Sequence, residues 1–296
     1  THSWSSKYEA TTQQKAYKKI KSVVKTSNAS AYLKSFAGDS EYYISIFDPN
    51  QGWEKTQREI IASFEAMRIF KISQHTPGVL SLVRAYKQDI INEKTLKRAL
   101  KAIENFHYLF TAVTSSRSSG GISAMYSSFG RKIFEAENSN QAGQVINELI
   151  DKLEERKPTY SEFVAGFEQI NYVRTNTKQS SLVRYTLRRI AAHQDLKFSD
   201  DFSNLTIEHL YPQAKIDDTW TSEIVGSMGN LILLSETDNN DLKDSDFATK
   251  LPLLKEIEAS VPSDVLEATD WTVSGVQERT KALAGVAYEN IWKIKQ

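Results

Sequence analysis

Two short apolar stretches decide the fold of the C-terminal part of the chain. They are Leu205-Thr206-Ile207-Glu208-His209-Leu210-Tyr211 and Met228-Gly229-Asn230-Leu231-Ile232-Leu233-Leu234-Ser235. Short apolar runs bounded by turn residues are typical of β-strands. Pro212 ends the first strand because proline cannot donate a ladder hydrogen bond. Residues 241–255 are predicted to be helical, with Pro252 as the point where that helix could break. The order predicted is strand, loop, strand and helix.

The sequence on either side of this unit is predicted to be helical. Residues 1 to about 195 contain four stripes of apolar residues at helical spacing, within residues 60–70, 79–86, 96–110 and 145–153. Residues 200–204 form a polar connector, and residues 276–292 return to helical spacing as a closing helix. We therefore expect a mainly α chain with a helical domain over residues 1–198 and a second domain over residues 199–296.

Composition restricts the class of protein. The 296 residues contain no cysteine, which excludes a cysteine nucleophile and a thiolate metal site. Lysine plus arginine equals aspartate plus glutamate at 37 each, so binding to nucleic acid would need a local basic patch. No apolar run is long enough to span a membrane, and the first residues do not resemble a signal peptide. We expect a cytoplasmic protein.

Four polar residues lie on and beside the predicted strands. Glu208 and His209 end the first strand, Asn230 begins the second, and Asn239 follows near a helix start. Hydrolysis of a phosphodiester bond needs a base that deprotonates water, a group that holds the base, and a cation for the developing charge. Histidine suits the base, and carboxylate and amide oxygens suit Mg²⁺ or Mn²⁺.

These residues resemble a known family. The C-terminal part of the chain resembles the HNH (His-Me finger) nuclease domain at the C-terminus of GmrSD-type type IV restriction enzymes. SspE-like phosphorothioate-sensing defence proteins carry a related domain. The matching positions are residues 207–213, residues 229–235, Asn239, and Phe247 with Lys250. Trp271, Arg279 and Trp292 also match the tail of that family, and residues 30–195 resemble its preceding helical region less specifically.

The resemblance implies a ββα-metal fold and a role for each site residue. His209 is the general base, Glu208 and Asn239 are ligands of Mg²⁺ or Mn²⁺, and Asn230 supports both the loop and the base. Asn240 is an alternative to Asn239. Because neighbouring side chains on a regular strand point to opposite faces, Glu208 and His209 can share a site only where the strand bends or ends.

The family also implies a partner domain. Its members usually carry an N-terminal nucleotide-hydrolysing domain of ParB-like fold, of which this sequence has no trace. The chain also lacks an initiator methionine, so we expect it to be the C-terminal part of a longer protein. Nucleotide hydrolysis and the sensing of DNA modification would belong to the missing part.

Each site residue has a structural alternative. Asn230 after Gly229 suits a turn, and Asn239 suits the N-cap of a helix that starts near Asp241. Glu208 suits an ordinary surface carboxylate, and Lys250 suits either a phosphate contact or a packed stem. The other histidines, His75, His107 and His193, lack such neighbours and are expected to be structural or surface residues.

Two basic stretches are candidates for DNA contact. The first, just before the predicted strands, contains Arg174, Lys178, Arg184, Arg188 and Arg189. The second, Lys15 to Lys25, is interpreted as a solvated helix face. Together with Lys250, the first stretch is predicted to hold DNA.

The sequence thus predicts a metal-dependent, HNH-type DNA endonuclease of a prokaryotic restriction or antiviral system. A single site of this kind nicks one strand of foreign or modified DNA. The alternatives are a catalytically inactive DNA-binding module, a ribonuclease on the same fold, and a helical scaffold in which residues 205–250 are purely structural.

Overall fold

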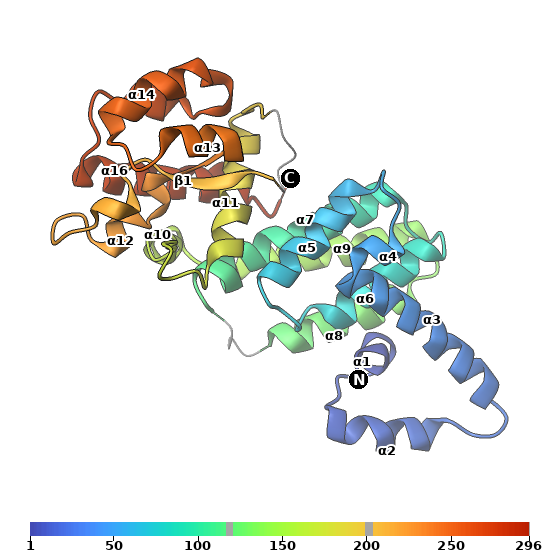
Figure 1. Cartoon of the computed structure of the whole chain (residues 1–296). Helices are drawn as coiled ribbons and strands as arrows, with labels where there is room; N and C mark the ends of the chain where they lie inside the picture. Colours follow the sequence, from blue (N-terminus) through green and yellow to red (C-terminus); the bar gives the residue numbers. More distant parts are fainter. Residues whose placement is uncertain (117–120, 199–203, 296) are drawn as a thin grey trace. The chain divides into compact units, whose positions relative to one another are not determined.

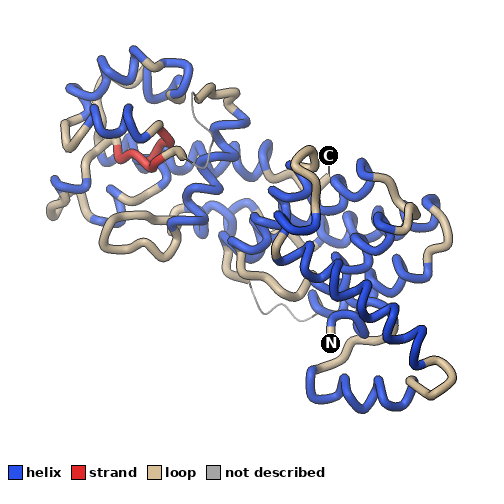
Figure 2. Tube along the Cα trace, turned by 45° about the vertical axis from the view of Figure 1, so that its right-hand side comes forward, coloured by secondary structure: helices blue, strands red, loops and turns tan. Residues whose placement is uncertain are grey.

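The computed structural model describes residues 1–116, 121–198 and 204–295, and the chain divides into two compact units (Figure 1). Unit 1 comprises residues 1–111 and 116–157 together with the chain from residue 294 on, and unit 2 comprises residues 112–115 and 158–293. Helices predominate in both units, while the two strands lie in unit 2 (Figure 2). The prediction of a mainly α chain with a small sheet is confirmed. No helix among the described residues is long and apolar enough to cross a membrane.

Unit 1 is built from helices alone among its described residues. In chain order they are α1 (His2–Lys7), α2 (Gln13–Val23), α3 (Ala29–Phe47), α4 (Pro49–Gly52), α5 (Arg58–Ile69), α6 (Thr76–Lys87), α7 (Glu93–His107), a π-helical turn (Tyr108–Val113) that continues α7 into unit 2, α8 (Ile122–Glu135) and α9 (Ser139–Glu155). The four predicted apolar stripes lie on α5, α6, α7 and α9, which confirms them.

Helix α6 lies at the centre of unit 1. It is buried along most of its length, and it packs closely against α8 because two glycines permit the approach. A Cβ atom at Gly78 would lie 2.8 Å from the Phe129 ring, and one at Gly130 would lie 2.8 Å from the Pro77 carbonyl oxygen. Larger side chains at either glycine would push the two helices apart.

Unit 2 contains the strands. Its elements are α10 (Tyr160–Phe167), α11 (Ser180–His193), β1 (Thr206–His209), a 3-10 turn (Gln213–Lys215), α12 (Ser222–Val225), a second 3-10 turn (Met228–Asn230), β2 (Leu231–Leu234), α13 (Glu236–Leu242), α14 (Phe247–Glu256), a third 3-10 turn (Glu258–Ser260), α15 (Ser263–Leu266), α16 (Val273–Val286) and a π-helical turn (Ala287–Ile291). Both predicted strands are present, each somewhat shorter than predicted.

The two strands pair antiparallel, and the register separates two faces of the sheet. Thr206 pairs with Leu234, and Glu208 pairs with Ile232. These side chains share one face, because residues directly opposite each other point the same way. On that face, Ile232 and Leu234 join a core that includes Leu242 of α13 and residues of α14. His209 pairs with Leu231 on the opposite face.

The helix predicted for residues 241–255 is corrected by the structure. Two helices occupy this region, and the first begins earlier than predicted, because Ser235 caps it by accepting a hydrogen bond from the Asp238 backbone N–H. Lys243, at φ 51°, ends α13. Pro252 lies inside α14 without breaking it. Because proline has no backbone N–H, the carbonyl of Ala248, four residues earlier, lacks its helical hydrogen bond. Ala248 is exposed, so that carbonyl can bind water instead.

The compact units divide near residue 158, whereas the sequence predicts a domain boundary at 198/199. That predicted boundary and most of the polar connector at 200–204 lie outside the described residues. The structure groups α10 and α11 with the strands, so unit 2 begins before the predicted second domain.

Candidate active site

Glu208 and His209 end β1 but meet different parts of unit 2. The Glu208 side chain reaches Lys250 of α14, whereas the His209 ring reaches Tyr172 in the segment before α11. The strand keeps its regular alternation through this pair, as the ladder register shows. The bend that would turn both side chains toward one site is therefore absent from this arrangement.

Both ring nitrogens of His209 are hydrogen-bonded. Nε2 lies 2.9 Å from the Tyr172 carbonyl oxygen, which can only accept, so Nε2 carries the hydrogen. Nδ1 lies 3.2 Å from Nε2 of Gln213, which donates to it. The neutral imidazole is thus held as one tautomer with its lone pair on Nδ1. That is the form a general base requires.

Burial sets the charge of His209. The side chain is 4% exposed. Burial lowers the pKa of His209 to about 4, with smaller contributions in the same direction from Lys250 and Arg174, while the hydrogen bond to Tyr172 raises the pKa. The imidazole is neutral at pH 7 and can accept a proton. Its affinity for that proton is low because the ring is buried, and a nearby phosphate would raise that affinity by adding negative charge.

Glu208 forms a buried ion pair with Lys250. The Lys250 Nζ atom lies 2.6 Å from Glu208 Oε1 and 2.7 Å from the His209 carbonyl oxygen. Burial raises the pKa of Glu208 above its ordinary value, and the Lys250 ammonium opposes that effect. Lys250, which the sequence predicts to contact DNA, is 1% exposed in this structure. Its ammonium instead fastens α14 to the end of β1.

Asn230 holds the loop that follows His209. Its Oδ1 accepts hydrogen bonds from the Tyr211 backbone N–H at 2.8 Å and from Trp271 Nε1 at 2.9 Å. Its Nδ2 donates to the carbonyl oxygens of Tyr211 at 3.0 Å and Val225 at 2.8 Å. The residue is fully buried. Asn230 thus supports the loop, as the resemblance implies, but its carboxamide bonds to Tyr211 and not to the imidazole.

Two residues of the C-terminal tail brace the Asn230 turn from α16. Arg279 Nη1 donates to the Gly229 carbonyl oxygen at 2.8 Å, and Thr280 Oγ1 accepts from the Gly229 N–H at 3.0 Å. A Cβ atom at position 229 would lie 2.1 Å from the Val276 carbonyl oxygen, so only glycine fits there. The tail residues Trp271 and Arg279 therefore act on the site through Asn230 and its glycine.

Asn239 lies inside α13 and does not cap a helix, because Ser235 is the N-cap. Its Nδ2 donates to Thr206 Oγ1 at 2.7 Å and to the Ile207 carbonyl oxygen at 3.3 Å. Asn239 therefore connects α13 to β1. The neighbouring Asn240 is exposed.

The donor set does not fit a divalent metal ion as it is arranged here. Glu208 directs a carboxylate oxygen to the Lys250 ammonium, which occupies the position beside it that a metal would need. The Asn239 amide donates its hydrogens to β1. Over the described residues, no group of three or more histidine, aspartate or glutamate side chains could hold a metal ion. The predicted ligands Glu208 and Asn239 consequently act as structural contacts in this arrangement.

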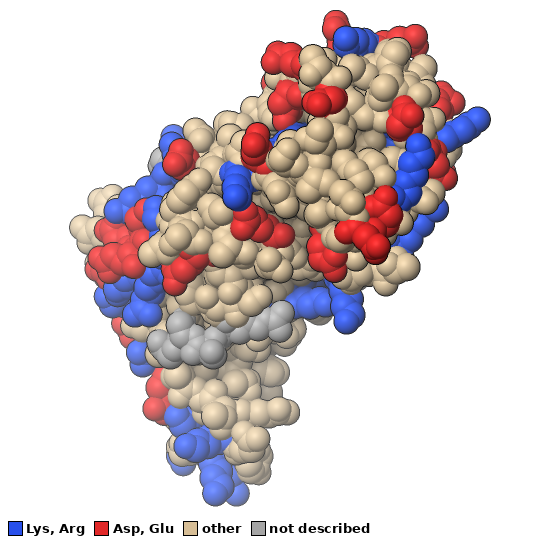
Figure 3. All heavy atoms as spheres, turned by 90° about the vertical axis from the view of Figure 1, so that its left-hand side faces the viewer, with Lys and Arg blue, Asp and Glu red and all other residues tan. Residues whose placement is uncertain are grey.

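The predicted basic stretch divides into two kinds of residue. Arg184 donates to the Leu205 carbonyl oxygen, and Arg189 donates to the Ile291 carbonyl oxygen at 3.3 Å while its guanidinium lies 5.4 Å from the Trp292 ring centre. Both therefore hold α11 to its neighbours. Arg174, Lys178 and Arg188 are exposed, as is Arg184 despite its hydrogen bond, whereas Arg189 is half-buried. Figure 3 shows acidic and basic side chains interspersed on one face, so a DNA contact would rest on a local group of cations.

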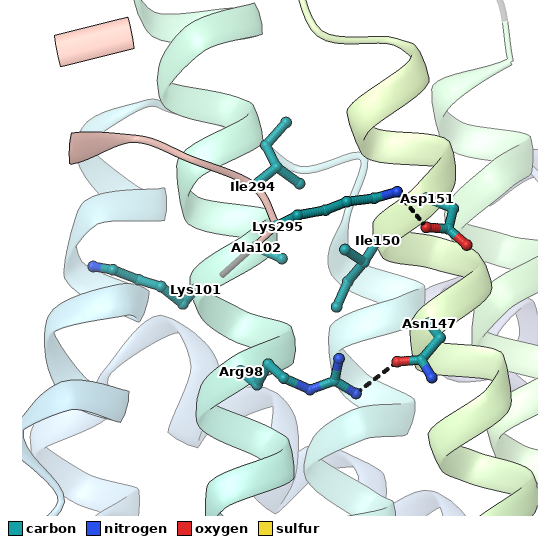
Figure 4. Close-up of a pocket in the computed structure, with 8 residues that line it drawn as sticks. All are labelled: Arg98, Lys101, Ala102, Asn147, Ile150, Asp151, Ile294 and Lys295. Atoms are coloured by element: carbon teal, nitrogen blue, oxygen red, sulfur yellow. Dashed lines mark hydrogen bonds and ion pairs between the residues drawn. The ribbon is translucent and has the colours of Figure 1, made fainter. Parts of the chain in front are cut away.

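A groove of about 390 Å³ in unit 1 also gathers cations (Figure 4). Arg98 donates to Asn147 at 2.8 Å, and Lys295 pairs with Asp151 at 2.8 Å. Lys101, also on its wall, pairs with Glu104 at 3.1 Å. The residues that line this groove include no histidine, and its one carboxylate, Asp151, is paired with Lys295, while Arg98 and Lys101 also have protein partners. The His209 environment is therefore the stronger candidate for a catalytic site.

Sequence reasoning assigned no role to Tyr172 or Gln213. Tyr172 acts through its backbone carbonyl, 37 residues before His209, and a backbone group leaves no signature in the sequence. Gln213 follows Pro212 within the quoted motif, and its spacing of four residues from His209 is the signal that could have indicated a contact.

His209 is a buried histidine of fixed tautomer at the end of a short strand, and Asn230 holds the loop that follows it. This arrangement suits a hydrolase of the nuclease class. Residues 157–286 match the family model of the C-terminal domain of GmrSD restriction endonucleases, which confirms the resemblance over this range. The matched range nearly coincides with the main segment of unit 2, and it includes only the end of the helical region at 30–195 that the sequence analysis assigned to the family. No curated protein matches the chain.

Proposed function

We propose that this chain is a restriction-type endonuclease that hydrolyses DNA phosphodiester bonds, with His209 as the general base. One observation carries the proposal: the His209 imidazole is neutral and oriented, with Nε2–H on the Tyr172 carbonyl and its lone pair on Nδ1. A water molecule would lose a proton to Nδ1 while its oxygen forms a bond to phosphorus. The bond from phosphorus to the leaving sugar oxygen then breaks, and that oxygen gains a proton. One such site cuts one strand, so nicking is the elementary act.

The arrangement of elements supports an HNH-type site. Strands β1 and β2 and helix α13 follow each other in the order of a ββα unit, and Asn239 fastens α13 to β1. His209 ends the first strand, and Asn230 immediately precedes the second. These positions are the ones that the family resemblance assigns to the base and to the residue that supports its loop.

We further propose that cleavage requires Mg²⁺ or Mn²⁺, which would stabilise the charge that develops on the phosphate. This requirement rests on the family resemblance, since the Glu208 carboxylate is engaged by Lys250 here. The same proposal has three further parts, which also rest on that resemblance. The substrate is foreign or modified DNA, the role is antiviral defence, and an N-terminal partner domain hydrolyses nucleotide.

A catalytically inactive DNA-binding module is the second candidate. Two observations favour this candidate. His209 is almost wholly buried, and Lys250 pairs with the carboxylate of Glu208, the residue next to His209 in the sequence. A ribonuclease on the same fold differs only in its substrate.

Supercoiled plasmid and labelled RNA test these alternatives together. The purified chain should convert supercoiled DNA into open circles with Mg²⁺ or Mn²⁺, and EDTA should stop the conversion. Cleavage that persists fully in EDTA would overturn the metal requirement. Binding of DNA without any cleavage would favour the inactive module, and cleavage of RNA alone would identify a ribonuclease.

A further inference from the structure

Gln213 connects the His209 ring to a backbone amide on the other side of the site. Its Oε1 accepts a hydrogen bond from the Arg174 backbone N–H at 2.6 Å. That bond determines which end of the carboxamide is the oxygen, so the other end, facing His209, is the NH₂ group. At 3.2 Å from Nδ1, this group can only donate to the imidazole.

The same short segment therefore holds the imidazole from both sides. Tyr172 accepts from Nε2, and Arg174, two residues later, anchors the glutamine that donates to Nδ1. A narrow turn follows, in which Val173 and Asn176 form an isolated bridge. A hydrogen on Nδ1 would collide with the Gln213 amide, and a bare Nε2 would face the Tyr172 carbonyl oxygen. Only one neutral tautomer satisfies both contacts.

We propose that Gln213 is a positioning residue that reserves Nδ1 of His209 as the basic nitrogen, an inference that rests on the proposed function of His209. The contact from Gln213 is longer than that from Tyr172, at 3.2 Å against 2.9 Å. It is therefore the weaker hydrogen bond and the one that an incoming water molecule replaces. The Tyr172 carbonyl keeps the ring oriented while that exchange takes place.

Gln213→Glu tests this role with little change of shape. A carboxylate can only accept hydrogen bonds, so it draws a hydrogen onto Nδ1 and removes the lone pair that the reaction needs. The cleavage rate should fall by about two orders of magnitude or more, the usual effect of losing a general base. Gln213→Ala removes the donor without supplying an acceptor and should reduce the rate less.

Nitrogen-15 NMR of the histidine rings supplies a readout that does not depend on activity, with His209→Gln used to assign the signals. The wild-type chain should show His209 as a neutral ring with a bare Nδ1 at neutral pH. Gln213→Glu should place a hydrogen on that nitrogen. Gln169→Glu, which makes the same change of charge at an exposed position, should alter neither the spectrum nor the rate.

The two proposals fail in different ways. A wild-type ring with its hydrogen on Nδ1, or a Gln213→Glu variant with an unchanged His209 spectrum, would overturn the role of Gln213. If Gln213→Glu shows the expected change of tautomer but the wild-type chain cleaves nothing, the role of Gln213 is supported and the proposed function alone is overturned. Melting temperatures of all variants identify any loss of fold.

Discussion

Asn230 uses every hydrogen-bonding position of its carboxamide. An asparagine side chain offers two acceptor and two donor positions, and Tyr211, Val225 and Trp271 occupy all four. The sequence indicated a turn residue after Gly229 and a support for the loop. It could not indicate the tryptophan, which lies 41 residues further along the chain.

Replacing Asn230 should therefore destabilise the fold as well as impair the site. Asn230→Ala leaves the buried Val225 carbonyl and the half-buried groups of Tyr211 and Trp271 without this partner, at about 1–3 kcal/mol for each group that stays unsatisfied. We expect a loss of about 3 kcal/mol in the free energy of unfolding, measured by urea denaturation. Asn240→Ala, at an exposed position nearby, is the control and should cost little. Equal stability of the two variants would contradict the stabilising role of the Asn230 hydrogen bonds.

At the scale of elements, the sequence predicted those features that depend on neighbouring residues. Strands β1 and β2 follow from short apolar runs, although β1 ends at His209, before the Pro212 that was expected to end it. Helix α13 was missed because Ser235 supplies its cap inside a polar stretch that suggests a loop. Its end at Lys243 was missed because the positive φ of that residue depends on the surrounding fold and not on its own preference.

The connection between α14 and β1 also depends on tertiary structure. From sequence, Lys250 suited either a phosphate contact or a packed stem, and Glu208 suited a metal ligand. Only the fold brings the two charges together, 42 residues apart, with the Lys250 ammonium also bonded to the His209 carbonyl oxygen. This ion pair positions the end of the strand that carries His209.

Removing one partner of this pair should cost more than removing both. Lys250→Met leaves a buried carboxylate uncompensated, which typically costs about 3–5 kcal/mol of stability. The double variant Lys250→Met/Glu208→Gln should recover part of that loss, because no unpaired charge remains. Lys255→Met, at an exposed lysine of the same helix, is the control. Thermal or urea unfolding gives the comparison, and a Lys250→Met variant as stable as that control would refute a stabilising pair.

At the scale of the whole molecule, the family match and the compact units agree on where the nuclease-like part begins. Residues 157–286 match the family, and the main segment of unit 2 starts at Pro158. The residue pattern changes near residue 199, where the strands begin, but α10 and α11 belong to the same compact unit as the strands. The spacing of apolar residues could not assign α10 and α11 to unit 2, because the helices of both units have the same spacing.

The exposed cations beside the site are the expected contacts to DNA. Arg174 lies two residues from Tyr172, close enough to lower the pKa of His209, and Lys178 is also exposed. Changing both to alanine should weaken DNA binding and reduce the slope of log affinity against log salt by about 0.9 for each lost phosphate contact. Lys15→Ala/Lys18→Ala in α2 removes the same charge from the other basic stretch. A larger effect from the α2 variant would place the DNA surface there.

The most direct test of the account is the nicking rate of folded His209→Ala. Because His209 is buried and bonded to Tyr172, its loss should cost about 1–3 kcal/mol of stability, so the rate is measured well below the melting temperature of the variant. His193→Ala, at an exposed histidine, is the control and should cleave normally. We predict a fall of about two to four orders of magnitude for folded His209→Ala. Cleavage by that folded variant at the wild-type rate would contradict the role of His209 as the base.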